Sequence, residues 1–398
     1  MPTDATLTSP YPLSGWAERQ VTTFRELTGA PALRDLRGAG LLVERAAING
    51  FAVPGTVSAG GGCRLLPAKG GWVALNLARE DDRALLPALF LDGELDPESD
   101  AAVAAALLKW DAEEIVARGR EMGLALAGLC EAYRHGNHIS PSASSNKRVS
   151  RAVQQPPLVI DLSALWAGPL AGHLLWLAGA EVIKVESRRR PDAMRDGDAG
   201  LFTLLNQGKA NVALDLKAPA DRDALLSLIA RADIVIEAAR PRALRQLGID
   251  ADALVRAHPG LSWVTITGHG VEGEAADWVG FGDDCGVAGG LSAALCEVTG
   301  QVGFVGDAIA DPLTGLAAAN AAWAGWASGE GGRITLSMSG IVRSALDEER
   351  ARDEATLQAG LHHWATRMGQ PITTAPVRTP TASVAALGAD NAKWLISC

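Results

Sequence analysis

The second half of the chain alternates short β-rich runs with helix-like segments, and this alternation constrains the fold more than any other feature. The runs cover residues 158–162, 181–185, 212–216, 234–236 and 263–267. Helix candidates lie between them at 169–177, 219–231, 241–247 and 251–257. Pro169, Pro219 and Pro241 each suit a first helical turn, where a missing N–H costs nothing. Strands and helices at this spacing predict βαβ units around a parallel sheet, and therefore an α/β fold.

The loops after these runs are where we expect a ligand, because parallel sheets of this kind bind ligands beyond the carboxyl ends of their strands. Two of the loops carry arginines, namely Arg188, Arg189, Arg190 and Arg195 after the second run and Arg240 after the fourth. Such cations favour an anionic ligand such as a phosphate, and a solvated arginine cluster is the alternative. Residues 268–273 match GxGxxG, but they do not open the first βαβ unit and no clear amphipathic helix follows. We therefore exclude a nicotinamide-binding fingerprint.

The first half has a different pattern. Helical periodicity at 16–27, 99–109 and 112–122 surrounds a hairpin built from residues 63–66 and 72–76, with Gly70 and Gly71 in its turn. This pattern predicts a small α+β domain. Residues 133–157 contain no Asp or Glu and several basic residues; they indicate either a solvated connector or a basic strip that contacts an anionic ligand.

Composition excludes several classes of protein. The 36 Lys and Arg residues face 46 Asp and Glu residues, giving a net charge of −10, which argues against a nucleic-acid partner. None of the five cysteines is spaced as CxxC, so we expect a reducing cytoplasm rather than a disulfide framework or a structural zinc site. Residues 1–13 show no signal peptide, and the apolar stretch 162–180 is interrupted by Pro169. We expect no membrane partner.

Five segments of the second half resemble the class III CoA-transferase family, the CaiB/BaiF type. Each motif is weak alone, but the five occur in the family's order between about residues 157 and 345. They are LVIDLS with AGP (158–163, 167–169), LAGAEVIKVE (177–186), NQGK with VALDLK (206–209, 212–217), ADIVIE with RP (232–237, 240–241), and VGDAIAD (305–311).

The resemblance implies a Rossmann-like CoA-binding domain with a parallel sheet, next to a smaller α+β domain. The expected boundaries are 15–132 for the small domain, 133–157 for the linker, 158–345 for the CoA-binding and catalytic domain, and 346–398 for a C-terminal helix and tail. The family usually begins with its nucleotide-fold half. Since the small-domain-like segment comes first here, we expect a circularly permuted arrangement, and the resemblance also implies a homodimer.

The resemblance assigns the acyl carrier to Asp311. Its carboxylate is expected to attack the donor thioester, and the released CoA thiolate then forms an aspartyl-CoA thioester, from which the acceptor acid takes the CoA. Two alternatives remain for this position. Asp311 precedes Pro312 and is typical of a helix N-cap, and Asp307 competes as the nucleophile.

The expected contacts of CoA follow from the same matches. Arg188, Arg195, Lys209 and Arg240 are candidate phosphate contacts, with an exposed structural lysine as the alternative for Lys209. Trp166 either packs on the pantetheine arm or belongs to the core. Gly268 and Gly270 are candidates for backbone N–H groups that stabilise an oxyanion, and His269 is a second catalytic candidate as a hydrogen-bond partner or base.

The function expected from the resemblance is transfer of CoA between an acyl-CoA and a carboxylic acid. An acyl-CoA racemase or isomerase is an alternative, although Phe281 stands where racemases of the family have a histidine. The third alternative is an inactive CoA-binding paralogue. We expect CoA as a substrate, no permanently bound cofactor, and no metal, since the pair His362 and His363 has no evident third ligand.

Overall fold

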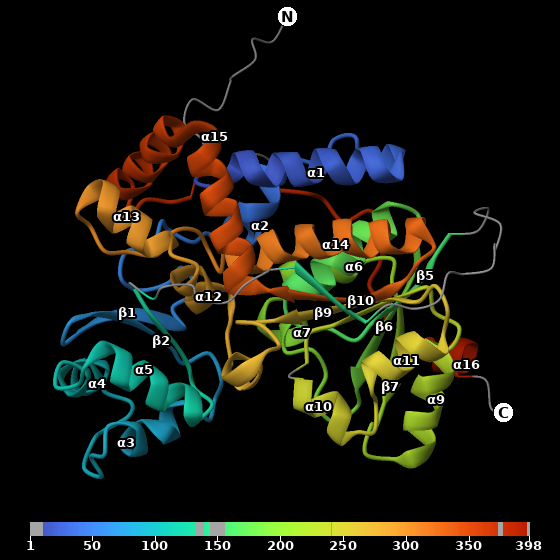
Figure 1. The fold of residues 1–398 in the computed structure, drawn as a ribbon, viewed down its shortest axis with the longest axis horizontal. Helices are drawn as coiled ribbons and strands as arrows, with labels where there is room; N and C mark the ends of the chain where they lie inside the picture. The colour runs from blue at the N-terminus through green and yellow to red at the C-terminus, as the bar shows by residue number, and fades with distance from the viewer. Residues whose placement is uncertain are drawn as a thin grey trace, which may run out of the picture.

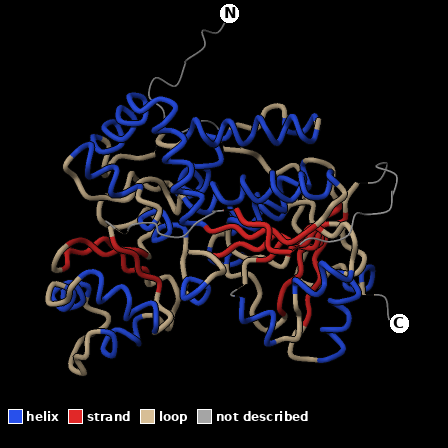
Figure 2. The backbone as a smooth tube through the Cα atoms, viewed as in Figure 1, coloured by secondary structure: helices blue, strands red, loops and turns tan. Residues whose placement is uncertain are grey.

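The computed structural model describes residues 11–129, 131, 139–143, 156–239, 241–372 and 377–395. Two separate sheets organise these residues (Figures 1 and 2). The larger sheet has the strand order β4-β10-β9-β8-β5-β6-β7. Its six parallel strands are β5 (Leu158–Asp161), β6 (Glu181–Ser187), β7 (Ala210–Leu214), β8 (Ile234–Glu237), β9 (Ser262–Thr267) and β10 (Gly332–Ser337). The α/β fold with a parallel sheet is thus confirmed.

The five strands expected from the sequence all occur, but two further strands extend the sheet. Strand β7 begins two residues earlier than expected, at Ala210. Strand β10 was missed because glycines and Arg333 interrupt its apolar run. Strand β4 (Ile139–Ala143) pairs antiparallel with β10 at the sheet edge, so the segment expected as an irregular linker contains a strand. This strand contains Pro141, and prolines are tolerated in edge strands. All basic residues of the expected linker lie outside the described residues.

Helices cover both faces of the large sheet (Figure 1). One face packs against α1 (Ser14–Thr28), α2 (Gly38–Asn49), α6 (Ala167–Leu177), α14 (Ala310–Ser328) and α15 (Met338–Thr366). The other face packs against α9 (Pro219–Ile229) and α11 (Ala251–Ala257). Successive residues of β8 alternate between these cores, with Ile234 and Ile236 in one and Val235 in the other, because neighbouring side chains of a strand point to opposite faces. Both faces are therefore buried, as parallel sheets require.

Several shorter helices complete this part of the chain. They are α7 (Met194–Gly197), α8 (Ala199–Asn206), α10 (Pro241–Gln246), α12 (Gly282–Ala288), α13 (Leu291–Thr299) and α16 (Asn391–Trp394). None of the helices within the described residues combines the length and the apolar character that crossing a membrane requires.

The smaller sheet is antiparallel, with the order β1-β2-β3 for strands β1 (Cys63–Ala68), β2 (Gly71–Asn76) and β3 (Ala125–Gly128). The expected hairpin is present, and Gly70 takes the left-handed φ of +80° that its turn needs. Helices α3 (Leu86–Leu89), α4 (Asp100–Leu107) and α5 (Ala112–Glu121) accompany this sheet. Ser99 caps α4 by accepting a hydrogen bond from Ala102 N at 3.2 Å, as expected from the sequence.

The N-terminal helices α1 and α2 differ from the expectation that residues 15–132 form one small domain. Phe24 of α1 makes an edge contact with Trp323 of α14 at 6.2 Å between ring centres. Apolar residues of both helices join the core of the large sheet. The apolar face of α1 predicted a buried helix, but periodicity does not say against which sheet a helix packs. Strands from residues 63 to 128 form their own sheet, as the permuted arrangement requires; that arrangement remains a prediction.

Candidate active site

The carboxylate of Asp311 lies where three helices begin. Asp311 is the second residue of α14, and its Oδ1 accepts a hydrogen bond at 3.3 Å from the N–H of Ala167, the first residue of α6. Gly282, the first residue of α12, lies against the other oxygen, since a Cβ built there would be 2.1 Å from Oδ2. Helix N-termini present unpaired N–H groups and partial positive charge. The site is therefore suited to a carboxylate and to an oxyanion formed from it.

Asp311 faces a cavity of about 320 Å³ at the carboxyl edge of the large sheet. The cavity lies among the chain segments that follow three neighbouring strands, β5, β8 and β9. From β5 the chain proceeds to β6 and β7 on one side and returns to β8 and β9 on the other, so this edge is a topological switch point. The lining includes Leu165, Gly168, Thr267, Gly268, Gly280, Phe281 and Met338. The expectation of a ligand site beyond the strand ends therefore coincides with a cavity.

A group of acidic side chains surrounds Asp311 and shares one arginine. Arg45 from α2 places Nη1 at 3.2 Å from Asp307 Oδ1 and Nε at 3.7 Å from Asp198 Oδ2. Asp283 accepts a hydrogen bond from the N–H of Ala308 at 2.9 Å. Burial raises the pKa of Asp311 to about 7, although the Arg45 guanidinium and the Ala167 N–H oppose this shift. Asp311 is therefore only partly ionised near neutral pH.

Geometry distinguishes Asp311 from its two sequence-based alternatives. Asp311 is not an N-cap, because Ile309 occupies that position and Asp311 lies inside the first turn. Asp307 is completely buried beside Arg45 and does not line the cavity. Burial also raises the pKa of Asp307 to about 7. Of these two carboxylates, Asp311 alone reaches the cavity.

The glycine-rich turn after β9 brings backbone close to the site, but only in part as expected. Gly268 lines the cavity, and a Cβ there would lie 2.9 Å from the Cα of Gly280, so the close approach of the two loops needs glycine. Gly270 N donates to Thr267 Oγ1 at 3.0 Å, so this N–H is already used within the loop. The Gly270 N–H is thus directed into its own loop, whereas the Ala167 N–H is directed at the Asp311 carboxylate.

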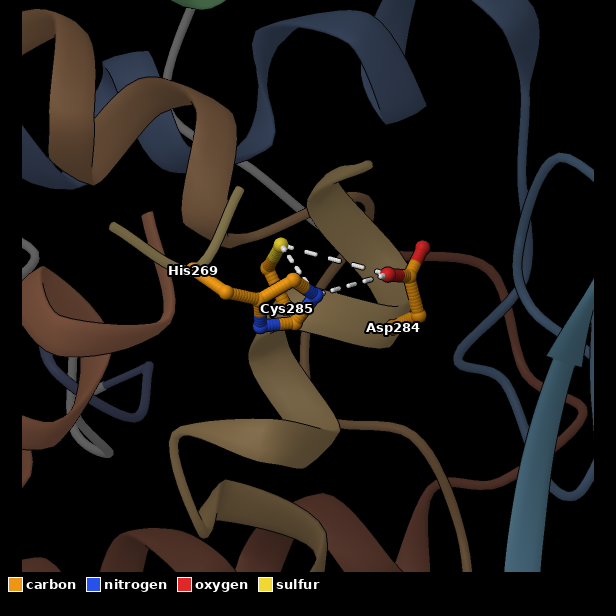
Figure 3. Close-up of side chains that lie close together, drawn as sticks. All are labelled: His269, Asp284 and Cys285. Carbon is orange, nitrogen blue, oxygen red and sulfur yellow. Dashed lines mark hydrogen bonds and ion pairs between the residues drawn. The ribbon is translucent and has the colours of Figure 1, made fainter. Parts of the chain in front are cut away.

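His269 does not line this cavity but a larger one. It lines a cavity of about 1250 Å³ between the small sheet and the loops after β9, together with Trp278, Arg120 and Ser339. Trp278 borders both cavities. Figure 3 shows His269 facing Asp284 and Cys285 of α12. The structure thus does not bring His269 and Asp311 together on one cavity surface.

Two of the expected CoA contacts are occupied by internal interactions. Lys209 is buried, and its Nζ lies 2.8 Å from Asp161 Oδ2 and 2.9 Å from the carbonyl oxygen of Pro169. Burial lowers the pKa of Lys209 to about 8. Arg195 pairs with Glu186 at 2.6 Å and stacks 4.6 Å from the ring centre of Phe202. Neither alternative for Lys209, an exposed lysine or a phosphate contact, describes this buried ion pair.

The other expected contacts divide between surface and core. Arg188 is exposed after β6, although its Nε donates to the Ala213 carbonyl at 3.0 Å. Trp166 is buried in the core, 5.7 Å from the Arg45 guanidinium, which matches its core alternative. Arg240 lies outside the described residues.

Sequence reasoning missed Arg45 and Gly282. Arg45 had no sequence signal, because it is an ordinary position in an amphipathic helix 266 residues before Asp311. Gly282 follows Phe281, the one residue of this stretch that was interpreted from the sequence. The acidic residues Asp283 and Asp284, which lie in the first turn of α12, were the available signal for a helix start.

Comparisons with known proteins support the resemblance. A CoA-transferase family III profile matches residues 157–376. Succinate–glutarate CoA-transferase of Agrobacterium fabrum is 32% identical over 214 residues, covering 48% of this chain and 54% of that protein. Succinyl-CoA–D-citramalate CoA-transferase of Chloroflexus aurantiacus is 32% identical over 206 residues, covering 46% and 50%. A crystal structure of a CAIB/BAIF family protein from Brucella suis shares 28% identity and a TM-score of 0.46, covering 50% of this chain and 56% of that one.

This chain spans about half the length of the curated relatives it matches. The profile match covers more than half of the 398 residues and contains β5 through α15, with Asp311 and the cavity that it lines. The chain belongs to CoA-transferase family III.

Proposed function

We propose that this protein transfers CoA between an acyl-CoA donor and a carboxylic acid, with Asp311 as the temporary acyl carrier. One observation carries the proposal: the Asp311 carboxylate opens onto the switch-point cavity where the first turns of α6, α12 and α14 meet. The family match and the names of the curated relatives support the same reaction class. Their printed names also suggest small dicarboxylic acids as first candidates for the acceptor.

The first half-reaction begins when a carboxylate oxygen of Asp311 attacks the thioester carbonyl carbon of the donor. The C–S bond breaks, CoA leaves as a thiolate, and a mixed anhydride remains on Asp311. The thiolate then attacks the aspartyl carbonyl, which releases the donor acid and leaves an aspartyl-CoA thioester. The acceptor carboxylate attacks that thioester and runs the same steps in reverse. Every negative charge formed at Asp311 develops beside the Ala167 N–H and the N-termini of α6 and α14.

Partial burial of Asp311 has two consequences for this chemistry. A weakly solvated carboxylate is a better nucleophile, because less water must be removed before it attacks. Only its ionised form attacks, and burial raises its pKa to about 7. The rate of acyl transfer therefore increases as the pH rises through about 7.

For the CoA phosphates we propose the exposed arginines after β6. Arg188 and Arg189 are exposed at the same carboxyl edge of the sheet as the cavity. Their partners Asp221 and Asp215, at 3.7 Å and 2.7 Å, are surface carboxylates that a phosphate can replace. Arg240 remains a further candidate that the described residues do not include.

The remaining parts of the proposal concern assembly and location. The family resemblance suggests a homodimer, which analytical ultracentrifugation of the purified chain tests directly. Cys63, Cys285 and Cys296 are free thiols in the structure, a state that a reducing cytoplasm maintains.

The decisive experiment incubates the protein with a panel of acyl-CoA donors, including succinyl-CoA, and then adds hydroxylamine, which attacks the aspartyl carbonyl of the thioester and displaces CoA. Peptide mapping by mass spectrometry is expected to find the hydroxamate on Asp311. A hydroxamate on Asp307 would move the nucleophile there, and complete absence of label with all donors would argue against covalent transfer. Exchange of an α-proton with deuterium in the absence of an acceptor acid would favour a racemase, and CoA binding in calorimetry without turnover would favour an inactive paralogue.

A further inference from the structure

Three buried side chains outside the Asp311 cavity direct potential metal-binding atoms toward one point (Figure 3). His269 Nε2 lies 3.9 Å from Asp284 Oδ2 and 4.0 Å from Cys285 Sγ. Cys285 Sγ lies 3.9 Å from the same Asp284 oxygen. The three atoms therefore form a nearly equilateral triangle, and each side chain is less than one-twentieth exposed.

The geometry differs from that of a hydrogen-bonded relay. A Cys–His–Asp relay uses the two ring nitrogens separately, one for the thiol and the other for the carboxylate. Here the sulfur and the carboxylate oxygen both face the same nitrogen, Nε2. The nitrogen–oxygen separation of 3.9 Å is also too long for a direct hydrogen bond. The convergence on one point therefore calls for a different explanation.

We propose that His269, Asp284 and Cys285 form a binding site for one divalent transition-metal ion of the zinc type. A point equidistant from the three atoms lies about 2.3 Å from each, close to Zn–S bond lengths and slightly beyond Zn–N and Zn–O bond lengths. A small contraction of the triangle brings all three atoms to bonding distance. One imidazole, one carboxylate and one thiolate are a donor set that suits zinc, whereas magnesium and calcium favour oxygen alone.

The surroundings orient these side chains as an outer shell orients metal ligands. Asp284 Oδ1, the oxygen that faces away from the triangle, accepts hydrogen bonds from Asn76 Nδ2 at 2.7 Å and from Phe281 N at 3.0 Å. These bonds hold Oδ2 toward His269 and Cys285. Of the three side chains, His269 lines the large cavity, so we expect the ion and a water molecule as its fourth ligand to enter from that side.

The proposed metal has a structural role. Its ligands come from the loop after β9 and from α12, and Asn76 of β2 supports Asp284, so the site connects the small sheet with the large one. Binding converts the Cys285 thiol, which now donates to the Gly268 carbonyl at 3.4 Å, into a thiolate and releases one proton to solvent. The reaction assigned to Asp311 takes no step through this ion. The two proposals can therefore fail independently.

The test titrates the purified full-length chain, first freed of metal by a chelator, with Co²⁺ and then with Zn²⁺. We expect saturation at about one ion per chain, a near-ultraviolet thiolate-to-cobalt charge-transfer band and visible bands of tetrahedral cobalt, which zinc then removes. Bound zinc is also expected to raise the melting temperature, since it binds only the folded state. Saturation of the wild-type chain without a thiolate band, or no saturable binding, overturns the proposal.

Matched variants locate the site. Cys285→Ser is expected to abolish the thiolate band, and His269→Gln to weaken binding at least about 100-fold, whereas Cys296→Ser, on the half-buried face of α13, should leave both unchanged. Asn76→Ala, which removes the hydrogen bond to Asp284 Oδ1 and also the side-chain acceptor of Ala78 N, should weaken binding about 10-fold. A band that survives Cys285→Ser and disappears in Cys63→Ser overturns the assignment. If Cys285→Ser does not fold, two results still test the metal site: the titration of the wild-type chain and the weaker metal binding expected of Asn76→Ala.

Discussion

Two buried polar clusters lie on either side of the first turn of α12, and they differ in whether the cluster contains its own cation. Gly282 and Asp283 adjoin the Asp311 cluster, in which several carboxylates share the Arg45 guanidinium. The next residues, Asp284 and Cys285, turn toward His269, where three different donor types converge. The first cluster has an internal cation and opens onto a cavity of about 320 Å³, whereas the second is suited to a cation from outside. One helical turn can thus serve two chemistries, because its successive side chains face different directions.

The variant with the largest expected effect, Asp311→Asn, tests whether the first cluster is catalytic. Asp311→Asn removes the attacking oxygen while nearly preserving shape, so we expect the turnover rate to fall about 1,000-fold or more. CoA affinity in calorimetry should change less than about threefold, because Asp311 contacts only the thioester end of the substrate in the proposed complex. Asp223→Asn on the exposed side of α9 is the matched control and should keep full activity. Wild-type turnover in Asp311→Asn would refute the assignment.

Gly282→Ala is expected to have the next largest effect. The new methyl group would lie 2.1 Å from Asp311 Oδ2 and 2.5 Å from the Ala308 carbonyl oxygen, so α12 or Asp311 must move. We expect turnover to fall about 100-fold and the free energy of unfolding to fall by about 1–3 kcal/mol. Gly93→Ala, where a Cβ meets nothing within 4 Å, is the control. Unchanged kinetics in Gly282→Ala would mean that close packing against Asp311 is not needed.

Arg45→Gln tests the internal cation of the first cluster. Removing an opposite charge raises the pKa of a carboxyl group, so the pKa of Asp311 should rise above about 7. We expect the inflection in kcat/KM to move to higher pH by about one unit and the rate at pH 7 to fall about 5-fold. Arg34→Gln, exposed before α2, should leave the profile unchanged. If the pH of the kcat/KM inflection is the same in Arg45→Gln as in the wild type, Arg45 does not affect the ionisation of the catalytic group.

Asp307→Asn tests the effect of the same cluster on stability. Burial raises the folded-state pKa of Asp307 to about 7 from an ordinary value of 3.8. Its contribution is therefore fully present below about pH 4 and is lost as the pH rises through about 7. The variant should lose less stability than the wild type between pH 5 and pH 8, by about 2–3 kcal/mol in urea unfolding. Identical pH dependence in the two proteins would show that Asp307 is not strained by burial.

The smallest effect concerns the proposed phosphate contacts. Arg188→Gln combined with Arg189→Gln should raise the KM for acyl-CoA about 3–10-fold and leave kcat nearly unchanged, because exposed cations contribute binding rather than transition-state contacts. The difference in KM between the double variant and the wild type should decrease as the salt concentration increases. Arg256→Gln on α11 is the control. A fall in kcat with unchanged KM would instead place these arginines close to the reacting atoms.

Local pattern was enough to identify much of the fold. The five expected strands, the hairpin with Gly70, the Ser99 cap and the helix that begins just before Asp311 all depend on residues within a few positions of one another. The expected edge of the sheet does hold a cavity, since the parallel order of the strands determines where their loops meet. These features depend on periodicity, capping and turn chemistry, and each of these is determined by residues that are close in the sequence.

Long-range contacts decided the rest. Nothing near Lys209 in the sequence indicates that its ammonium group is enclosed with Asp161, 48 positions away. Nothing near Arg45 indicates that α2 lies beside Asp307, and the convergence of His269 with Asp284 and Cys285 depends on how α12 meets the loop after β9. The amino-acid sequence by itself determined the elements, their parallel order and the family. Only the tertiary structure decided which charges are buried together, because burial and pairing depend on distances between segments that sequence spacing does not encode.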